Sequence, residues 1–108
     1  MTKHEQRILS ALVGKLAKGG FPLLCIRSDF DETDELPVKT LPALRKVFRE
    51  WDMYAPTIVF TDSEGQRHGV MVAEGNDESF IADWNCGNAT FDAIVDSVSE
   101  AASEGAYS

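Results

Sequence analysis

Two aspartates placed two residues apart, Asp29 and Asp31, are the residues in this chain whose types and spacing most readily suggest chemistry. They follow the apolar run of residues 21–26, and Thr33 comes two positions later, so the stretch reads Asp-x-Asp-x-Thr. An ionised carboxylate at the end of a strand can attack phosphorus, and a second carboxylate beside it can act as the acid or base. The stretch therefore raises the hypothesis of a small phosphatase or metal-dependent hydrolase.

This spacing resembles the first motif of the haloacid-dehalogenase-like phosphatases, and the resemblance implies that Thr61 in "TIVFTD" stands for the second motif. The family also has a lysine after that motif, carboxylates that hold a magnesium ion, and a doubly wound parallel sheet. Here the last lysine is Lys46, and residues 57–84 predict a meander that has no room for crossover helices. A hydrolase that uses Asp29 and Asp31 is therefore kept as an alternative, and we expect no catalytic residues.

Metal-binding patterns are incomplete along the whole sequence. An EF-hand loop that began at Asp29 would need Asp or Asn, Gly and Glu at positions that hold Thr33, Asp34 and Thr40. The two histidines and two cysteines are isolated and form no zinc-type pair. Cys25 lies within an apolar run, which is typical of a buried small hydrophobe rather than of a nucleophile with His68 as its base. We expect no metal site and no cofactor.

The elements that position these residues are predicted from apolar periodicity and turn residues. Apolar residues at helical spacing predict helices over residues 4–18, 41–51 and 89–103, the second capped by Thr40 and the third by Asn88 or Thr90. Apolar runs and alternating patterns predict strands over residues 21–26, 55–62, 67–74 and 78–84. Residues 28–40 are predicted to be a loop.

The resulting order, α-β-α-β-β-β-α, predicts a single α+β domain over residues 1–108, with a short frayed tail at about 104–108. We expect a largely antiparallel sheet of about four strands packed against helices, with residues 21–26 as a central strand covered on both faces. Trp51 and Trp84 are predicted to be core residues. In the last strand, Phe80, Ala82 and Trp84 are predicted to share one face.

Charge is distributed unevenly along the chain. The formal net charge is −8, made up of +4 over residues 1–27, −3 over residues 28–53 and −9 over residues 54–108. Direct binding to DNA or RNA normally needs a cluster of Lys and Arg, which the acidic second half lacks. The asymmetry instead favours a basic protein partner, because complementary potentials steer association.

We therefore predict a non-catalytic acidic protein that binds a basic, nucleic-acid-handling protein and inhibits it by electrostatic complementarity. In physical type this is similar to nucleic-acid-mimicking inhibitors such as anti-CRISPR and anti-restriction proteins from phages. The carboxylates expected to contact the partner lie in the 28–40 loop, at the turns of the meander and on the last helix: Asp29, Asp31, Glu32, Asp34, Glu35, Asp62, Glu64, Glu74, Asp77, Glu78, Asp83, Asp92 and Asp96.

Other functions stay open beside this one. A toxin-immunity protein would share the small size and acidic surface, and a self-associating accessory subunit would bury a strand edge or the region around Trp84. No apolar run approaches the roughly 20 residues that cross a bilayer, and the start of the chain does not read as a signal peptide. We expect a cytoplasmic protein, a monomer or small homo-oligomer, without contact to membranes.

Overall fold

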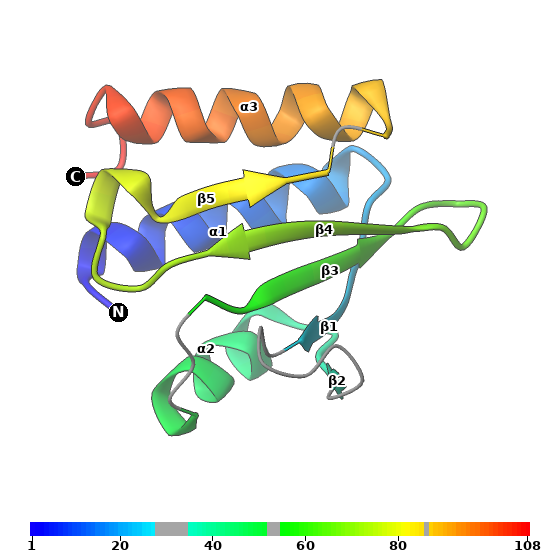
Figure 1. Cartoon of the computed structure of the whole chain (residues 1–108), viewed down its shortest axis with the longest axis horizontal. Coiled ribbons are helices and arrows are strands. Elements are labelled where there is room, and N and C mark those ends of the chain that lie inside the picture. The colour runs from blue at the N-terminus through cyan, green and yellow to red at the C-terminus, as the bar shows by residue number, and fades with distance from the viewer. Residues whose placement is uncertain (28–34, 52–54, 86) are drawn as a thin grey trace.

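The computed structural model describes residues 1–27, 35–51, 55–85 and 87–108 of the chain. Its elements are α1 (Lys3–Lys18), β1 (Leu23–Arg27), β2 (Glu35–Pro37), α2 (Leu41–Glu50), β3 (Thr57–Thr61), β4 (Arg67–Val72), the short 3-10 helix η1 (Asp77–Ser79), β5 (Ile81–Trp84) and α3 (Ala89–Ser103). The predicted α+β class and the order of the longer elements are confirmed (Figure 1). Within these ranges no helix combines the length and the apolar character that crossing a membrane requires.

The sheet has five strands in the order β2-β1-β3-β4-β5, and every neighbouring pair is antiparallel. The predicted count of about four strands was one too low, because β2 lies within the stretch that we expected to be a loop. This strand has only three residues and ends at Pro37, which suits the edge of a sheet because the missing N–H need not pair with a neighbour. As predicted, β1 lies inside the sheet, between β2 and β3.

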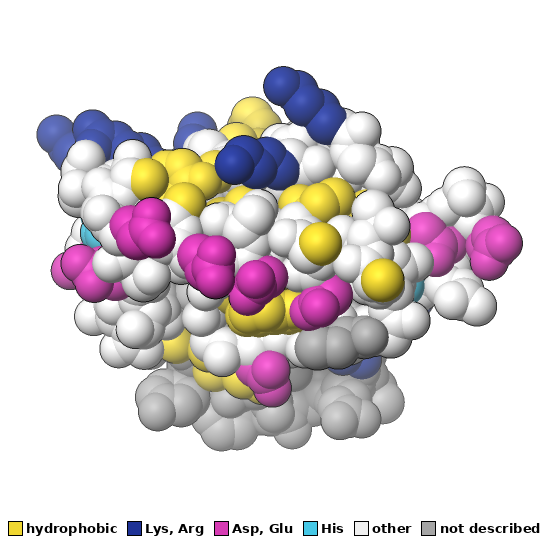
Figure 2. Space-filling model, turned by 90° about the horizontal axis from the view of Figure 1, so that it is seen from above, with side chains coloured by type: hydrophobic (Ala, Val, Ile, Leu, Met, Phe, Trp, Pro, Cys, Tyr) yellow, Lys and Arg dark blue, Asp and Glu magenta, His cyan; other side chains and the backbone are white. Residues whose placement is uncertain are grey.

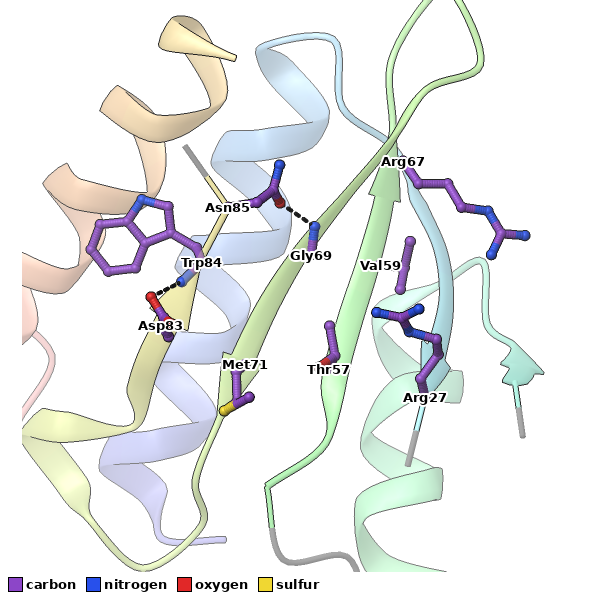
Figure 3. Close-up of a pocket in the computed structure, with 9 residues that line it drawn as sticks. All are labelled: Arg27, Thr57, Val59, Arg67, Gly69, Met71, Asp83, Trp84 and Asn85. Carbon is purple, nitrogen blue, oxygen red and sulfur yellow. Dashed lines mark hydrogen bonds between the residues drawn. The ribbon is translucent and has the colours of Figure 1, made fainter. Parts of the chain in front are cut away.

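All three helices pack on one face of the sheet, and the opposite face carries no helix (Figure 3). The helices bury apolar stripes at the predicted spacing, and these stripes join the sheet residues in one core. Its fully buried members include, from the helices, Ile8, Leu9, Leu12, Leu16, Leu44, Phe91, Val95 and Val98 and, from the strands, Ile58, Phe60, Val70 and Val72. The alternate strand residues therefore face away from the helices.

Local capping explains where the helices begin. The hydroxyl of Thr40 accepts a hydrogen bond from the amide of Ala43, and the side chain of Asn88 accepts one from the amide of Phe91. The predicted cap at Thr40 is confirmed, and Asn88 rather than Thr90 caps α3. Each side chain satisfies an amide that the first helical turn leaves without a partner.

Trp51 is not a core residue, contrary to its prediction, because 49% of its surface is exposed. The helix α2 ends at Glu50, and Trp51 has an extended backbone with φ −114° and ψ 130°. The apolar stripe of α2 therefore stops at Phe48, and the indole leaves the direction that helical periodicity assigned to it.

The predicted alternation of Phe80, Ala82 and Trp84 is also wrong. Phe80 precedes β5 with a helical backbone, so Phe80 and Ile81 are both buried whereas Ala82 is exposed. The register between β4 and β5 shifts at the same place, between Met71 and Val72. A bulge of this kind interrupts the two-residue period on which the prediction relied. Trp84 lies half-buried against the edge of the core.

Candidate functional site

The structure divides the predicted partner-binding carboxylates into three groups. Asp29, Asp31, Glu32 and Asp34 lie outside the described residues. Three more have partners within the chain, as described next. The remaining six are Glu64, Asp77, Glu78, Asp83, Asp92 and Asp96, which lie on the surface of two turns, β5 and α3.

Glu35, Asp62 and Glu74 have ion-pair or hydrogen-bond partners within the chain. Glu35 on β2 pairs with Arg67 on β4 at 2.5 Å, and Asp62 pairs with His68 at 2.9 Å. Glu74 lies 2.9 Å from the amino group of Met1. A partner protein would have to compete with these contacts, so we expect the three carboxylates to contribute less to binding than exposed carboxylates such as those of Glu78 and Asp96.

The two turns of the meander lie at opposite ends of the sheet, as the antiparallel pairing of β3, β4 and β5 requires. The turn between β3 and β4 contains Gly65, whose φ of 79° lies in the left-handed region that glycine adopts easily. The connection between β4 and β5 contains Asp77, the one described non-glycine residue with positive φ, at 45°. The carboxylates at the two ends therefore cannot act on one small ligand together.

A continuous acidic surface forms where α3 meets the η1–β5 segment. We call it the acidic face and define it as Asp77, Glu78, Asp92, Asp96, Glu100 and Glu104. Figure 2 looks down on α3 and shows acidic side chains in a row across this side, with Lys and Arg gathered along the other side of the view. Glu100 and Glu104 were not among the carboxylates predicted to contact the partner, although their four-residue spacing from Asp96 was visible in the sequence.

The fold of α3 determines which way these carboxylates point. The helix buries Phe91, Val95, Val98 and Ala102, so the positions between them face outward. Asp92 is also tied to the strand layer, because the indole N–H of Trp84 donates a hydrogen bond to its carboxylate at 2.6 Å. This bond fixes the first carboxylate of the row relative to β5.

A groove of about 450 Å³ runs between η1, β5 and α3, beside the acidic face. Glu78 lines it from η1 and Glu100 from α3, and the rest of its lining consists of Asn76, Ile81 and the small residues Ser79, Ala82, Ser99 and Ser103. Small side chains leave space between the two carboxylates. The groove is therefore shaped to admit a long basic side chain.

The sheet face without helices is a second candidate surface, which we call the open face. Its depression of about 550 Å³ is lined by Arg27, Thr57, Val59, Arg67, Gly69, Met71, Asp83, Trp84 and Asn85 (Figure 3). Gly69 forms part of its floor, and a Cβ atom there would lie 2.9 Å from Cγ2 of Thr57. No signal in the sequence pointed to this surface, because its residues come from four different strands.

Cys25 lies on the open-face side of β1, since Ile26 beside it belongs to the core. It is 3% exposed, and burial is the main cause that raises the pKa of its thiol, followed by the nearby carboxylate of Glu35. His68 faces the helices from β4 and stacks on Phe91 at a ring distance of 5.0 Å. The two side chains are on opposite faces of the sheet, so they do not form a nucleophile and base pair.

A partly buried series of hydrogen bonds through His68 links the first meander turn to the end of β5. Nε2 of His68 lies 2.9 Å from Asp62, and its Nδ1 lies 3.4 Å from the side-chain nitrogen of Asn85. The side-chain oxygen of Asn85 accepts from the amide of Gly69, so the nitrogen must face the ring. In the neutral ring, Nδ1 then accepts a hydrogen bond from Asn85, and Nε2 donates one to Asp62. The sequence alone did not indicate this series of hydrogen bonds.

Asp62 is expected to make stability depend on acid pH. The hydrogen bond from His68 is the largest cause that lowers the pKa of Asp62 below its ordinary value, and the amide of Gln66 adds to it. A lowered folded-state pKa stabilises the protein above the unfolded-state pKa of about 4, and this contribution is lost as pH falls through the folded value. Asp62→Asn should therefore flatten the fall in stability below about pH 4.

Urea unfolding of both proteins at a series of pH values between 2 and 7 measures this effect. The matched control is Glu64→Gln, in the same turn, whose side chain is exposed and should leave the slope unchanged. Parallel curves for wild type and Asp62→Asn would contradict the prediction.

The geometry separates the two motifs of the phosphatase alternative. Arg27, the last residue of β1, pairs with Thr57 at the beginning of β3, whereas Thr61 ends β3. The two segments that would carry the motifs therefore leave the sheet at opposite ends, about 13 Å apart at 3.3 Å per residue. Asp29 and Asp31 themselves lie outside the described residues. Elsewhere in the chain, the described His, Cys, Asp and Glu side chains form no group of three placed to hold a metal ion.

Comparison with known proteins provides no family for this chain: no protein-family model, no curated protein and no solved structure matches it.

Proposed function

We propose that this protein works without catalysis, by binding a basic surface of another protein through its acidic face and blocking that surface. The observation that carries the proposal is the row of carboxylates along α3. Asp92, Asp96 and Glu100 follow one another at four-residue intervals, and Glu104 continues the row at the C-cap. A basic partner would meet one carboxylate about every 6 Å, given a rise of about 1.5 Å per residue.

This row is unfavourable for the helix itself. Like charges four residues apart destabilise a helix by about 0.2–0.5 kcal/mol per pair. The last turn of α3 contains no basic residue, and Glu100 and Glu104 lie where the helix dipole disfavours negative charge. Asp92 has a role in folding, because it lies in the first turn of α3 and accepts a hydrogen bond from Trp84. Folding does not account for Asp96, Glu100 and Glu104, whereas recognition of a basic surface would.

The groove beside the row supports a specific contact rather than a diffuse one. A Lys or Arg of the partner that enters between Glu78 and Glu100 would be neutralised from two sides. The serines of the lining can accept hydrogen bonds from the same cation. This arrangement favours a partner that presents long basic side chains at regular intervals, as the nucleic-acid-binding grooves of proteins do. We therefore propose a nucleic-acid-handling protein as the partner and competition with its nucleic acid as the mode of inhibition.

The test compares wild type with Asp96→Asn/Glu100→Gln, which removes two charges from the row. Immobilised wild type should capture a basic protein from its native host at about 50 mM salt and lose it at about 500 mM, because exposed charges are screened. The double variant should bind the purified partner about tenfold more weakly while its own unfolding free energy rises by a few tenths of a kcal/mol. Wild type should also displace nucleic acid from that partner.

The matched control is Glu50→Gln, at the exposed end of α2 and outside the acidic face, which should bind like wild type. Salt-independent capture, equal binding by the double variant, or a partner that keeps its nucleic acid in the presence of wild type would each contradict the proposal.

A further inference from the structure

We propose that the open face of the sheet is the interface of a symmetric dimer, and that its occupant is a second copy of this chain. The proposal is independent of the acidic face, which lies on α3 and η1 and stays exposed in such a dimer. It rests on how the sheet register places charge on the open face.

The register lines up four open-face residues in one straight row across four strands. Arg27 on β1 pairs with Thr57 on β3, Thr57 with Met71 on β4, and Met71 with Asp83 on β5. Across these four strands the row carries a positive charge on β1, a negative charge on β5 and an uncharged middle (Figure 3). Its two ends are about 14 Å apart, three strand spacings of about 4.8 Å. On the edge strand β2, Glu35 continues the register beside Arg27, and its carboxylate is paired with Arg67.

Neither charge of this row is neutralised by the other within one chain. Of the ion pairs that the described residues form, none includes Arg27 or Asp83. The Asp83 carboxylate accepts only a local hydrogen bond among the described groups, from the amide of Trp84 at 2.9 Å. The two charges are therefore available to a partner with the opposite arrangement.

A second copy has that arrangement when it stacks on the open face in the correct orientation. A two-fold axis that lies between the sheets, parallel to the strands and midway between β3 and β4, exchanges β1 with β5 and β3 with β4. Arg27 of each copy then faces Asp83 of the other, and Thr57 faces Met71. Sheets stack about 10 Å apart with their strands nearly aligned, which brings the paired side chains together. Both charge pairs form at once, as an isologous interface requires.

The next row of the open face is uncharged. Val59 on β3 pairs with Gly69 on β4, so the exchange of β3 and β4 places each Val59 against Gly69 of the other copy. A glycine within a strand weakens it and often marks a close approach of another chain. Met71 adds an apolar contact, since it is one of only two large hydrophobic side chains that are exposed in the described part of the chain. Because Val59 is only 2% exposed and Thr57 already lies against Gly69, this row keeps the middle of the interface uncharged and supplies no interlocking contact.

The few contacts of this interface predict a weak dimer. Stable complexes bury about 800 Å² per partner, whereas this interface has two charge pairs and the exposed side chain of Met71 between them. We therefore expect dissociation constants in the micromolar range or weaker, and a mass that rises with concentration. Sedimentation velocity from about 5 µM to 1 mM measures that rise.

Charge reversal tests the geometry. Arg27→Asp places two acids opposite each other at both ends of the interface, and Asp83→Arg places two bases there. Each single variant should dimerise at least about tenfold more weakly than wild type, because like charges placed opposite each other repel. The double variant Arg27→Asp/Asp83→Arg restores opposite charges and should recover dimerisation. Arg7→Asp on α1 makes the same change away from the face and should behave like wild type.

Mixing the two single variants gives the sharpest result. Arg27→Asp supplies acids at both ends and Asp83→Arg supplies bases at both ends, so an equimolar mixture should form a heterodimer although neither protein dimerises alone. Circular dichroism and thermal unfolding establish whether each variant is folded. If a charge-reversal variant is not folded, the neutral substitutions Arg27→Gln and Asp83→Asn take its place.

Recovery in the double variant or in the mixture supports the proposal. It is overturned if wild type stays monomeric up to 1 mM, which would leave the face to a different molecule. It is also overturned if folded double variant and mixed single variants associate no better than the single variants.

Discussion

Replacing Glu5 by alanine is expected to lower the free energy of unfolding by about 3–5 kcal/mol. The side chain of Glu5 is fully buried, and its carboxylate accepts three backbone hydrogen bonds. The donors are the amide of Thr2 at 3.0 Å, the amide of Gly75 at 2.8 Å and the amide of Asp77 at 3.1 Å. Bonds to a charged group contribute about 1.5–3 kcal/mol each, and alanine would leave the three donors without their acceptor.

The reason for this large effect is that Glu5 joins two distant parts of the chain. With Thr2 it closes a capping box at the beginning of α1. With Gly75 and Asp77 it holds the connection between β4 and β5, where both residues have positive φ. Loss of the carboxylate therefore frees the first turn of α1 and the η1 segment together, which no surface glutamate does.

Thermal unfolding measures the result, and a loss of this size lowers the midpoint by on the order of 15–30 °C for a chain of this length. Glu5→Gln should be intermediate, because an amide oxygen still accepts but carries no charge. The control Glu50→Ala removes an exposed glutamate from the end of α2 and should change the midpoint little. A Glu5→Ala midpoint close to that of the control would show that water replaces the carboxylate.

Phe91→Ala is the second substitution with a large expected effect. Phe91 is fully buried in the first turn of α3, and its ring lies 5.2 Å from that of Phe21, 6.0 Å from Phe60 and 5.0 Å from the imidazole of His68. Removing a buried phenylalanine side chain leaves a cavity and costs about 3–5 kcal/mol. We expect a loss in that range, together with a weaker attachment of the N-terminal end of α3.

Hydrogen exchange shows where the effect is felt, because α3 should lose protection before the central strands β3 and β4 do. Phe91→Leu keeps most of the volume and should cost roughly half as much. Trp51→Ala, which removes an aromatic ring that is 49% exposed, should cost less than about 1 kcal/mol. A uniform loss of protection, or equal costs for Phe91→Ala and Trp51→Ala, would contradict the role assigned to Phe91.

The acidic face and the open face use different parts of the fold. The acidic face depends on α3, which is anchored through Phe91 and through the hydrogen bond from Trp84 to Asp92. The open face depends on the register of β1, β3, β4 and β5. A dimer through the open face would present two acidic faces to a partner, so the two proposals are compatible and their variants do not overlap.

Much of the local structure could be predicted from the sequence for simple physical reasons. Helices with one apolar stripe repeat every 3.6 residues, which located α1, α2 and α3 to within a few residues. The cap at Thr40 and the turn at Gly65 followed from local backbone chemistry alone. The predicted burial pattern was wrong where the backbone departs from a regular helix or strand. At Trp51 the helix ends, and at Phe80 the bulge interrupts the two-residue period of the strand.

By itself, then, the sequence determined the fold class, the length and order of the main elements and the acidic character of the second half. Only the tertiary structure decided which charges remain available, because Glu35, Asp62 and Glu74 found partners far from them or across a turn. It also decided the burial of Glu5 and the row from Arg27 to Asp83. Such features depend on strand register and on contacts between distant segments, and the type of a residue carries no information about which distant residue lies opposite it.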